Sequence, residues 1–479
     1  MTAERKTDGK GDRTRPASGS VAAEIAPTLR LAVPVVLAEL GWMAMGVEDT
    51  LIVGRLGPES IGAVGLGSML HFVPAIFGMG MLLGLDAVVS RAFGEGRLDE
   101  CHRSLVQGVY LALFLTPPLM LLVAALGPAM AWWGVDPTVL GLVGPYLRAI
   151  NWSTPPLLIY AAFRRYVQGM GRAAPVMAAL VVANVLNIAG NFVLVFGLLG
   201  FPRMGVEGSG WATCLARLAM AAMLVSYAFW HDRRAGTGFW NVSLRPDRAR
   251  LGRLFGLGLP AATHLALEVG VFGAATALAG TMGAATLAAH HIVLNASSVT
   301  FMVPLGVASA GAVRVGQALG RGDPATAARA GWSALILGVG FMACTGLAFV
   351  LAPGAVLRLY TDRPEVLSIG LSLMSMAALF QLFDGMQGVA TGILRGAGDT
   401  RTPMLVNLGA HWFLGLPLGA TLAYGLGWGA RGLWAGLAFG LIVAGLILIR
   451  TWAAMARRLA DEHDASHPET RRPPQEGQP

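Results

Sequence analysis

Apolar stretches long enough to cross a lipid bilayer recur along the chain, with short polar segments between them. A helix needs about 20 predominantly apolar residues to span the hydrocarbon core. The pattern predicts twelve transmembrane helices, at 29–54, 61–90, 105–127, 139–162, 173–198, 206–230, 255–280, 284–312, 326–351, 366–393, 402–427 and 431–456. The predicted fold class is therefore an all-α polytopic membrane protein.

One long polar break, at 231–253, divides these spans into two halves of six. An offset of 226 residues superposes Pro34 on Pro260 and Gly94 on Gly320. An even number of spans in each half gives parallel repeats, with the substrate site between them. The predicted organisation is a disordered cytoplasmic arm at 1–25, a first lobe at 26–230, a cytoplasmic linker at 231–253, a second lobe at 254–456 and a cytoplasmic tail at 457–479.

Composition and charge agree with this prediction. Apolar residues make up 55% of the chain and charged residues 13%, about half the charged share of soluble domains. The net charge of +8 lies in the loops, so it reflects topology and predicts no nucleic-acid partner. Of the 35 basic residues, 28 fall on one side of the predicted membrane and six on the other. By the positive-inside rule both termini are cytoplasmic, and we expect a multi-pass protein of the plasma (inner) membrane, in contact with lipids and monomeric.

Two acidic residues stand alone in apolar spans. Glu268 is the only charge in 254–280, and Asp384 is the only charge in 366–394. An acid at the centre of a membrane helix costs roughly 2.5–3.5 kcal/mol on insertion scales, so it usually has a function. At 1.5 Å per residue the two lie roughly 20 Å and 17 Å from the inner ends of their helices. We expect both to face one cavity and bind the driving ion; the alternative is a buried hydrogen bond that serves packing.

His264 lies one turn before Glu268 on the same helical face. It is a candidate to pair with the acid and tune its protonation, since histidine titrates near neutral pH. A hydrogen bond to a neighbouring helix is the alternative.

The first half has its own polar residues. Asn184, Asn187 and Asn191 follow one another at helical spacing, and Asp49 lies near the outer end of the first span. The asparagine stripe either lines a cavity with Asp49 or holds helices together by hydrogen bonds. Because water reaches the outer end, we expect Asp49 to contribute less to coupling than Glu268. Asp86 is expected to pair with Arg91 at the inner end of the second span.

Motifs of enzymes are absent from the sequence. It contains no HExxH, no phosphate-binding Walker loop and no nucleophile elbow. We therefore expect a transporter that is not an enzyme, has no cofactor and uses an ion gradient rather than ATP. The alternative function from a different class is that of a membrane-embedded metalloenzyme, with His264, Glu268 and another histidine as metal ligands.

Four segments stand out: MGVEDTLIVGRLG in the first span, LALEVGVF and AAHHIVLNASSVTFMVP in the seventh and eighth, and FDGMQGVATGILRGAGDTRTP in the tenth and eleventh. Together they resemble the multidrug and toxic compound extrusion (MATE) family, near its NorM-type branch. The resemblance covers about 25–456. It implies a V of two six-helix lobes, which exports bulky, often cationic organic compounds against an inward flow of Na⁺ or H⁺. The alternative transporter is a lipid-linked-saccharide flippase of a related fold.

The family's site residues map onto several of these positions. The resemblance implies that Glu268 and Asp384 are the acids of the second-lobe cation site, that Asp49 is the acid of the first span, and that Asn187 belongs to a first-lobe site. Asn191 stands where many relatives of another branch have aspartate.

The coupling ion is either H⁺ or Na⁺, and sodium at Glu268 and Asp384 would be the only metal. We favour the proton because burial and a second nearby acid both favour a protonated carboxyl group. His264 and His291 stand where the family suggests an apolar residue and glutamine, which leaves the ion open.

Overall fold

The computed structural model describes residues 20–130 and 137–466, which fold almost entirely into helices. Most of the predicted arm and the end of the predicted tail lie outside the described residues. The helices of the first half are α1 (Val21–Val53), α2 (Pro58–Met81), α3 (Gly84–Gly94), α4 (Leu98–Ala129), α5 (Pro137–Asn151), α6 (Thr154–Gly169), α7 (Ala174–Phe196) and α8 (Val206–Ala235), with a short 3₁₀ turn η1 (Gly54–Leu56) after α1.

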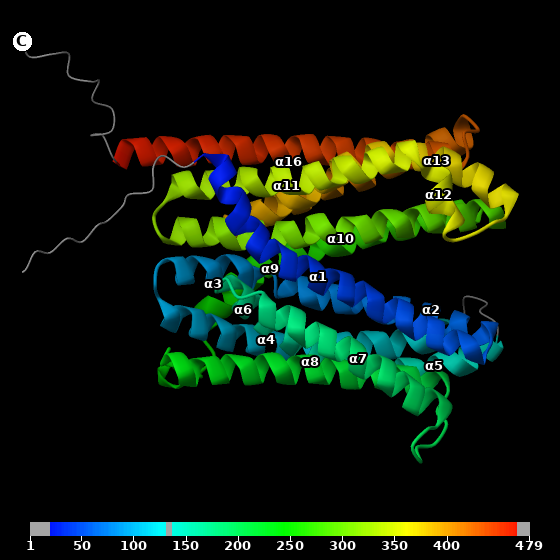
Figure 1. Cartoon of the computed structure of the whole chain (residues 1–479), viewed down its shortest axis with the longest axis horizontal. Coiled ribbons are helices and arrows are strands. Elements are labelled where there is room, and N and C mark those ends of the chain that lie inside the picture. The colour runs from blue at the N-terminus through cyan, green and yellow to red at the C-terminus, as the bar shows by residue number, and fades with distance from the viewer. Residues whose placement is uncertain (1–19, 131–136, 467–479) are drawn as a thin grey trace, which may run out of the picture.

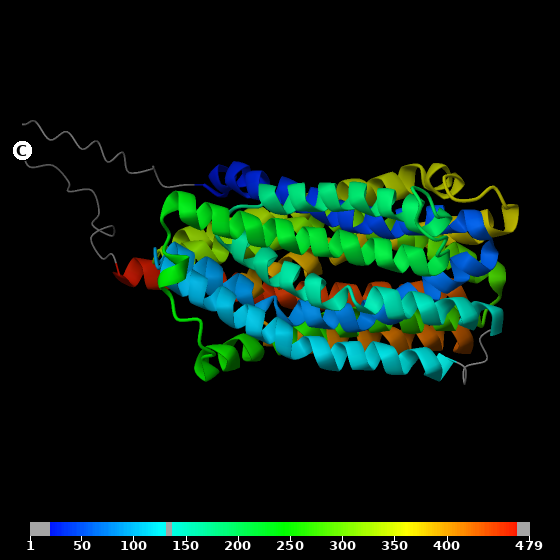
Figure 2. The same cartoon turned by 90° about the horizontal axis from the view of Figure 1, so that it is seen from below.

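The second half begins after a 3₁₀ turn, η3 (Phe239–Asn241), in the linker. Its helices are α9 (Arg248–Gly280), α10 (Ala284–Gly320), α11 (Pro324–Leu351), α12 (Pro353–Arg358), α13 (Pro364–Gly396), α14 (Arg401–Asn407), α15 (Leu416–Ala420) and α16 (Ala430–Ser466). Two π-helical segments, η4 (Leu408–Gly415) and η5 (Thr421–Gly425), lie on either side of α15. The long helices run along the long axis of the molecule in both views (Figure 1, Figure 2).

Eleven helical segments in the described ranges are long and apolar enough to cross a membrane. The predicted span at 139–162 is the exception, because it consists of α5 and α6, which are 15 and 16 residues long. The break falls just before Pro155 and Pro156. Proline lacks the N–H that would continue the hydrogen bonding of the preceding helix, so it fits the first turn of a new one. With this broken span, the described helices account for the twelve predicted spans.

α1 begins and α16 ends at the same end of the molecule, which we call the termini end (Figure 1). There the two halves approach each other through reciprocal glycines. A Cβ added to Gly94 would lie 2.1 Å from the carbonyl oxygen of Gln317, and one added to Gly320 would lie 2.1 Å from that of Arg91. Gly94 and Gly320 are the pair that the repeat offset aligned, and Arg91 and Gln317 are related by the same offset. The contact is therefore symmetric between the repeats.

This contact yields the first prediction. In Gly320→Ala the new methyl group meets backbone, which has no side-chain freedom to move aside, so the halves must separate locally. Overpacking of this kind costs about 1–3 kcal/mol. We expect a lower melting temperature of the purified protein and slower transport. Gly340→Ala on α11 is the control, because a Cβ there meets nothing within 4 Å; equal melting temperatures for the two variants would contradict the close contact.

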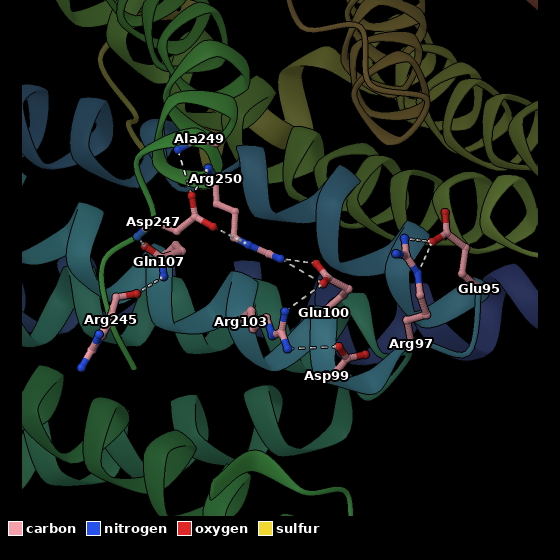
Figure 3. Close-up of polar contacts among 10 residues, drawn as sticks. All are labelled: Glu95, Arg97, Asp99, Glu100, Arg103, Gln107, Arg245, Asp247, Ala249 and Arg250. Atoms are coloured by element: carbon pink, nitrogen blue, oxygen red, sulfur yellow. Dashed lines mark hydrogen bonds and ion pairs between the residues drawn. The ribbon is translucent and has the colours of Figure 1, made fainter. Parts of the chain in front are cut away.

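Hydrogen bonds and an ion pair join the end of the linker to α4 of the first half (Figure 3). Gln107 donates a 3.1 Å hydrogen bond to the carbonyl oxygen of Arg245 and accepts one of 3.0 Å from the backbone N–H of Asp247. Arg250, in the first turn of α9, pairs with Glu100. The backbone N–H of Arg250 holds the pKa of Asp247 below its usual value, so this residue caps α9 as an anion. These contacts fix where the second half begins relative to the first.

Candidate functional site

Two long helices carry the acids of the second half. α9 holds His264 and Glu268 one turn apart, and α13 holds Asp384 with Gln387 one turn further on. Asp384 is only 5% exposed, and the side chain of Glu268 is 17% exposed. Both helices are apolar around these positions because they cross the membrane, so the few polar side chains meet one another rather than water.

The predicted second-half residues come together around Glu268. Gln387 Nε2 donates to Glu268 Oε1 at 3.4 Å, and His264 Nε2 lies 3.7 Å from Glu268 Oε2. Asp384 interacts electrostatically with Glu268. Among residues 20–130 and 137–466, no arginine or lysine forms an ion pair with either acid. The site therefore concentrates negative charge when both acids are ionised.

Two other buried acids of the described chain, Glu39 and Asp86, have basic partners. Glu39 pairs with Arg164 inside the first half. Asp86 Oδ2 lies 3.1 Å from Arg395 Nε and 3.5 Å from Arg165 Nη1. The expected pairing of Asp86 with Arg91 is wrong, because α13 brings Arg395 to Asp86 across the boundary between the halves, whereas Arg91 contacts Glu95. A paired acid supports structure, whereas an unpaired one is available to an ion.

Residues around the π-helical segment η4 were missed by the sequence analysis. Trp412 Nε1 donates to the carbonyl oxygen of Leu267, next to Glu268, at 3.0 Å. His411 interacts electrostatically with Glu268, and its Nε2 is buried without a hydrogen-bond partner among the described residues. Both side-chain amide atoms of Asn407 are likewise unpartnered. The sequence feature that could have revealed them is an asparagine and a histidine in one apolar span. The face on which they lie was not predictable, because a π-helix has a different number of residues per turn from the α-helix that the sequence pattern assumes. Such segments often occur at functional sites.

A second cluster surrounds Asp49 in the first half. Asn191 Nδ2 donates to Asp49 Oδ1 at 2.7 Å, and Thr213 Oγ1 donates to Oδ2 at 2.9 Å. Asn187 donates to Thr213 Oγ1 at 3.3 Å, which completes the cluster. Asp49 is 5% exposed. Our expectation that water hydrates it is therefore wrong, because α7 and α8 cover it despite its position near the end of α1.

Asn184 does not join this cluster. Its Nδ2 donates to the carbonyl oxygens of Gly41 at 3.0 Å and Leu180 at 3.1 Å, which is the helix-joining alternative. Thr213 was missed because a lone threonine in an apolar helix usually bonds its own backbone. Arg217, one turn further along α8, interacts electrostatically with Asp49 and donates to Ser153 Oγ at 2.6 Å. The first-half acid is thus surrounded by hydrogen-bond donors and lies near a positive charge.

The chemistry of the two clusters differs. Asp49 has neutral donors on both oxygens, which stabilise its ionised form without an added ion. Glu268 accepts only the 3.4 Å bond from Gln387, and Asp384 has no hydrogen-bond donor among the described residues, so a bound proton or a small cation would relieve their mutual repulsion. The described residues contain no group of three or more His, Cys, Asp or Glu side chains arranged to hold a metal ion. The two clusters therefore differ in how far hydrogen-bond donors compensate their negative charge.

Comparisons with known proteins find relatives along most of the chain. The MatE family profile matches the chain twice, over residues 34–193 and 260–421. The two matches begin 226 residues apart, which is the offset of the internal repeat. A probable multidrug resistance protein NorM from Mesorhizobium japonicum is 38% identical over 90% of this chain and 93% of its own length. The multidrug resistance protein NorM of Burkholderia vietnamiensis is 37% identical over 92% and 96%.

Solved structures share the fold. The crystal structure of the eukaryotic MATE transporter AtDTX14 matches with a TM-score of 0.82 at 20% identity, over 92% of this chain and 99% of that one. An outward-facing multidrug resistance MATE family transporter matches with a TM-score of 0.82 at 19% identity, over 92% and 97%.

Proposed function

This chain belongs to the MATE family, and we propose that Glu268 and Asp384 form the site at which its coupling cation binds. As a MATE protein of the NorM kind it is a multi-pass membrane transporter, a cation-coupled antiporter for multidrug efflux and not an enzyme. Its substrates are small organic compounds, often cationic and bulky. Expression of the chain should therefore raise the tolerance of cells to a range of such compounds.

One observation carries the proposal. Gln387, one turn from Asp384 on α13, donates to Glu268 of α9 at 3.4 Å, so both acids belong to one buried cluster, and neither forms an ion pair with arginine or lysine in the described ranges. Two ionised acids repel each other strongly where water does not screen them, so the pair favours the uptake of a cation or a proton. An ion gradient can drive the transporter only if the ion binds to it, and this uptake is that binding step.

The coupling follows from the arrangement of the halves. Contacts such as the reciprocal glycines close the termini end in this conformation. With both termini cytoplasmic, as the distribution of basic residues favours, the closed end faces the cell interior. A bound cation drives the change only through different affinities in the two conformations. Occupancy of the acid pair therefore favours the packing of α9 and α13 that lets substrate leave.

We favour H⁺ as the coupling ion. The groups near Glu268 include two histidines, His264 and His411, whose neutral rings can accept and pass on a proton. Sodium would need several oxygen ligands, and nitrogen atoms take up part of the surroundings of Glu268. Gln387 Oε1 is unpartnered among the described residues and is the oxygen best placed to serve sodium instead.

A comparison of the two clusters tests this assignment. Glu268→Gln should reduce efflux of a fluorescent cationic dye to the level of cells without the protein. Asp49→Asn should be milder, at roughly a tenth to a half of normal efflux, because Asn191, Thr213 and Arg217 already compensate its charge. The measurement is dye efflux at matched expression. If Asp49→Asn is as damaging as Glu268→Gln, the second-half pair is not the sole coupling site.

A further inference from the structure

A cavity of about 450 Å³ lies at the termini end, between elements of both halves. Its walls are α1, the turn between α6 and α7, one residue of α8 and the end of α10. It is separate from the acid pair, since neither Glu268 nor Asp384 lines it. The transport cycle described above assigns it no role.

The cavity carries excess positive charge. Arg30 of α1, Arg172 of the α6–α7 turn and Arg314 of α10 all line it. Glu24 pairs with Arg314, but no carboxylate of the described chain pairs with Arg30 or Arg172. Arg314 Nε is buried and has no hydrogen-bond partner among the described residues. The arginines therefore leave about two uncompensated positive charges around one space.

The wall at the α6–α7 turn adds a further positive potential. α7 begins at Ala174, and no side chain caps its N-terminus. Pro175 has no N–H, and the N–H groups of Val176 and Met177 bond to the carbonyl oxygen of Ala173, so the start of α7 contributes mainly the partial positive charge of the helix dipole, which attracts anions such as phosphate. Here that helix start adjoins Arg172, so two independent features favour the same ligand charge.

The surroundings are those of the boundary between lipid and water. Leu29 and Val33, on either side of Arg30 along α1, are 39% and 51% exposed, as expected for a helix face in contact with lipid. Tyr227 lines the cavity, and its ring lies 6.1 Å from that of Trp230, which is 52% exposed. Tyrosine and tryptophan gather at the depth of lipid headgroups. The cavity thus opens where headgroups lie.

We propose that this cavity binds the phosphate group of an anionic phospholipid. Arg30, Arg172 and the start of α7 contact it from the first half, and Arg314 contacts it from the second. A basic pocket between membrane helices is the kind of site that such headgroups occupy. Because the arginines come from both halves, the lipid bridges them and favours the conformation closed at the termini end. This last consequence rests on the proposed alternating access, whereas the binding itself does not.

Lipid binding is measured on the full-length protein, independently of transport. Native mass spectrometry of protein mixed with phosphatidylglycerol or phosphatidylcholine counts retained lipids and gives relative affinities. In the double variant Arg30→Gln, Arg172→Gln the affinity for phosphatidylglycerol should fall about fivefold for each arginine removed, with phosphatidylcholine unaffected. Arg172→Lys should retain binding because it keeps the charge.

The matched control is Arg233→Gln, Arg248→Gln, which removes two exposed arginines that do not line the cavity. It should bind phosphatidylglycerol as the unmodified protein does. Equal loss of phosphatidylglycerol in both double variants, or in neither, would overturn the proposal. Inorganic phosphate, added to protein in phosphatidylcholine nanodiscs, distinguishes the source. If millimolar phosphate raises the melting temperature of the unmodified protein but not of Arg30→Gln, Arg172→Gln, the ligand of the cavity is phosphate from solution. That result would overturn the proposal of a bound lipid.

Discussion

Replacing Asp384 with asparagine is expected to abolish ion-coupled efflux and to leave the folded protein in the membrane. The amide has nearly the size of the acid, so packing of α13 is preserved. It cannot take up a proton or neutralise a cation, however, and it removes the repulsion with Glu268 that makes the site receptive. Since charged groups in membrane helices are costly, the variant should be at least as stable as the native chain. Dye efflux should fall to the background of cells that lack the protein.

The control for this variant lies on the same helix. Glu365→Gln removes an exposed acid in the first turn of α13, far along the helix from Asp384. It should leave efflux unchanged. Efflux near the normal rate in Asp384→Asn, at matched expression, would contradict the assignment of Asp384 to the coupling site.

Asp86→Asn is expected to have a comparable effect for a different reason. Asp86 accepts contacts from Arg165 of its own half and Arg395 of the other, and its side chain is only 2% exposed. Without the carboxylate the two arginines, 13% and 10% exposed, face each other inside the interface. Removing one partner from a buried charge network costs about 3–5 kcal/mol. The closed termini end should therefore open, which spin-label distances between the halves would detect, and transport should collapse.

A second variant separates this mechanism from simple misfolding. Adding Arg395→Gln to Asp86→Asn removes one of the two uncompensated charges, so part of the closed population should return. Glu95→Gln is the control at the same end, since its partners Arg91 and Arg97 have side chains that are 54% and 58% exposed. Exposed pairs contribute about 0–1 kcal/mol. If Glu95→Gln opens the termini end as far as Asp86→Asn does, the interface pair is not what holds it closed.

Much of this architecture is predictable from sequence because the bilayer restricts the choices. Backbone groups in lipid must bond within their own helix, so apolar length alone identifies most spans. The repeat offset also pairs Gly94 with Gly320, and both glycines lie at the contact between the halves. The broken span of α5 and α6 shows the limit, because hydropathy records the apolar residues on both sides of Pro155 and Pro156 but not the break between them.

The sites were predictable as far as charge in an apolar span is informative. Around Glu268 the structure places His264 of the same helix and Gln387 of α13, one turn from Asp384, whereas the shared cation site stays a prediction. Partners from other helices were not predictable. Thr213 reaches Asp49, and Arg395 reaches Asp86, through packing that no local pattern encodes. His411 depends on a π-helical register, which differs from the α-helical one that sequence periodicity assumes.

The central claim is that proton uptake at Glu268 and Asp384 drives export. The most direct test reconstitutes the purified protein in liposomes and imposes either a pH gradient or a sodium gradient alone. Substrate transport should follow the pH gradient, ignore sodium and vanish in Asp384→Asn, and His264→Ala should slow it. Transport that follows sodium, ignores pH and is unchanged in His264→Ala would contradict the proton mechanism and leave the two acids as sodium ligands.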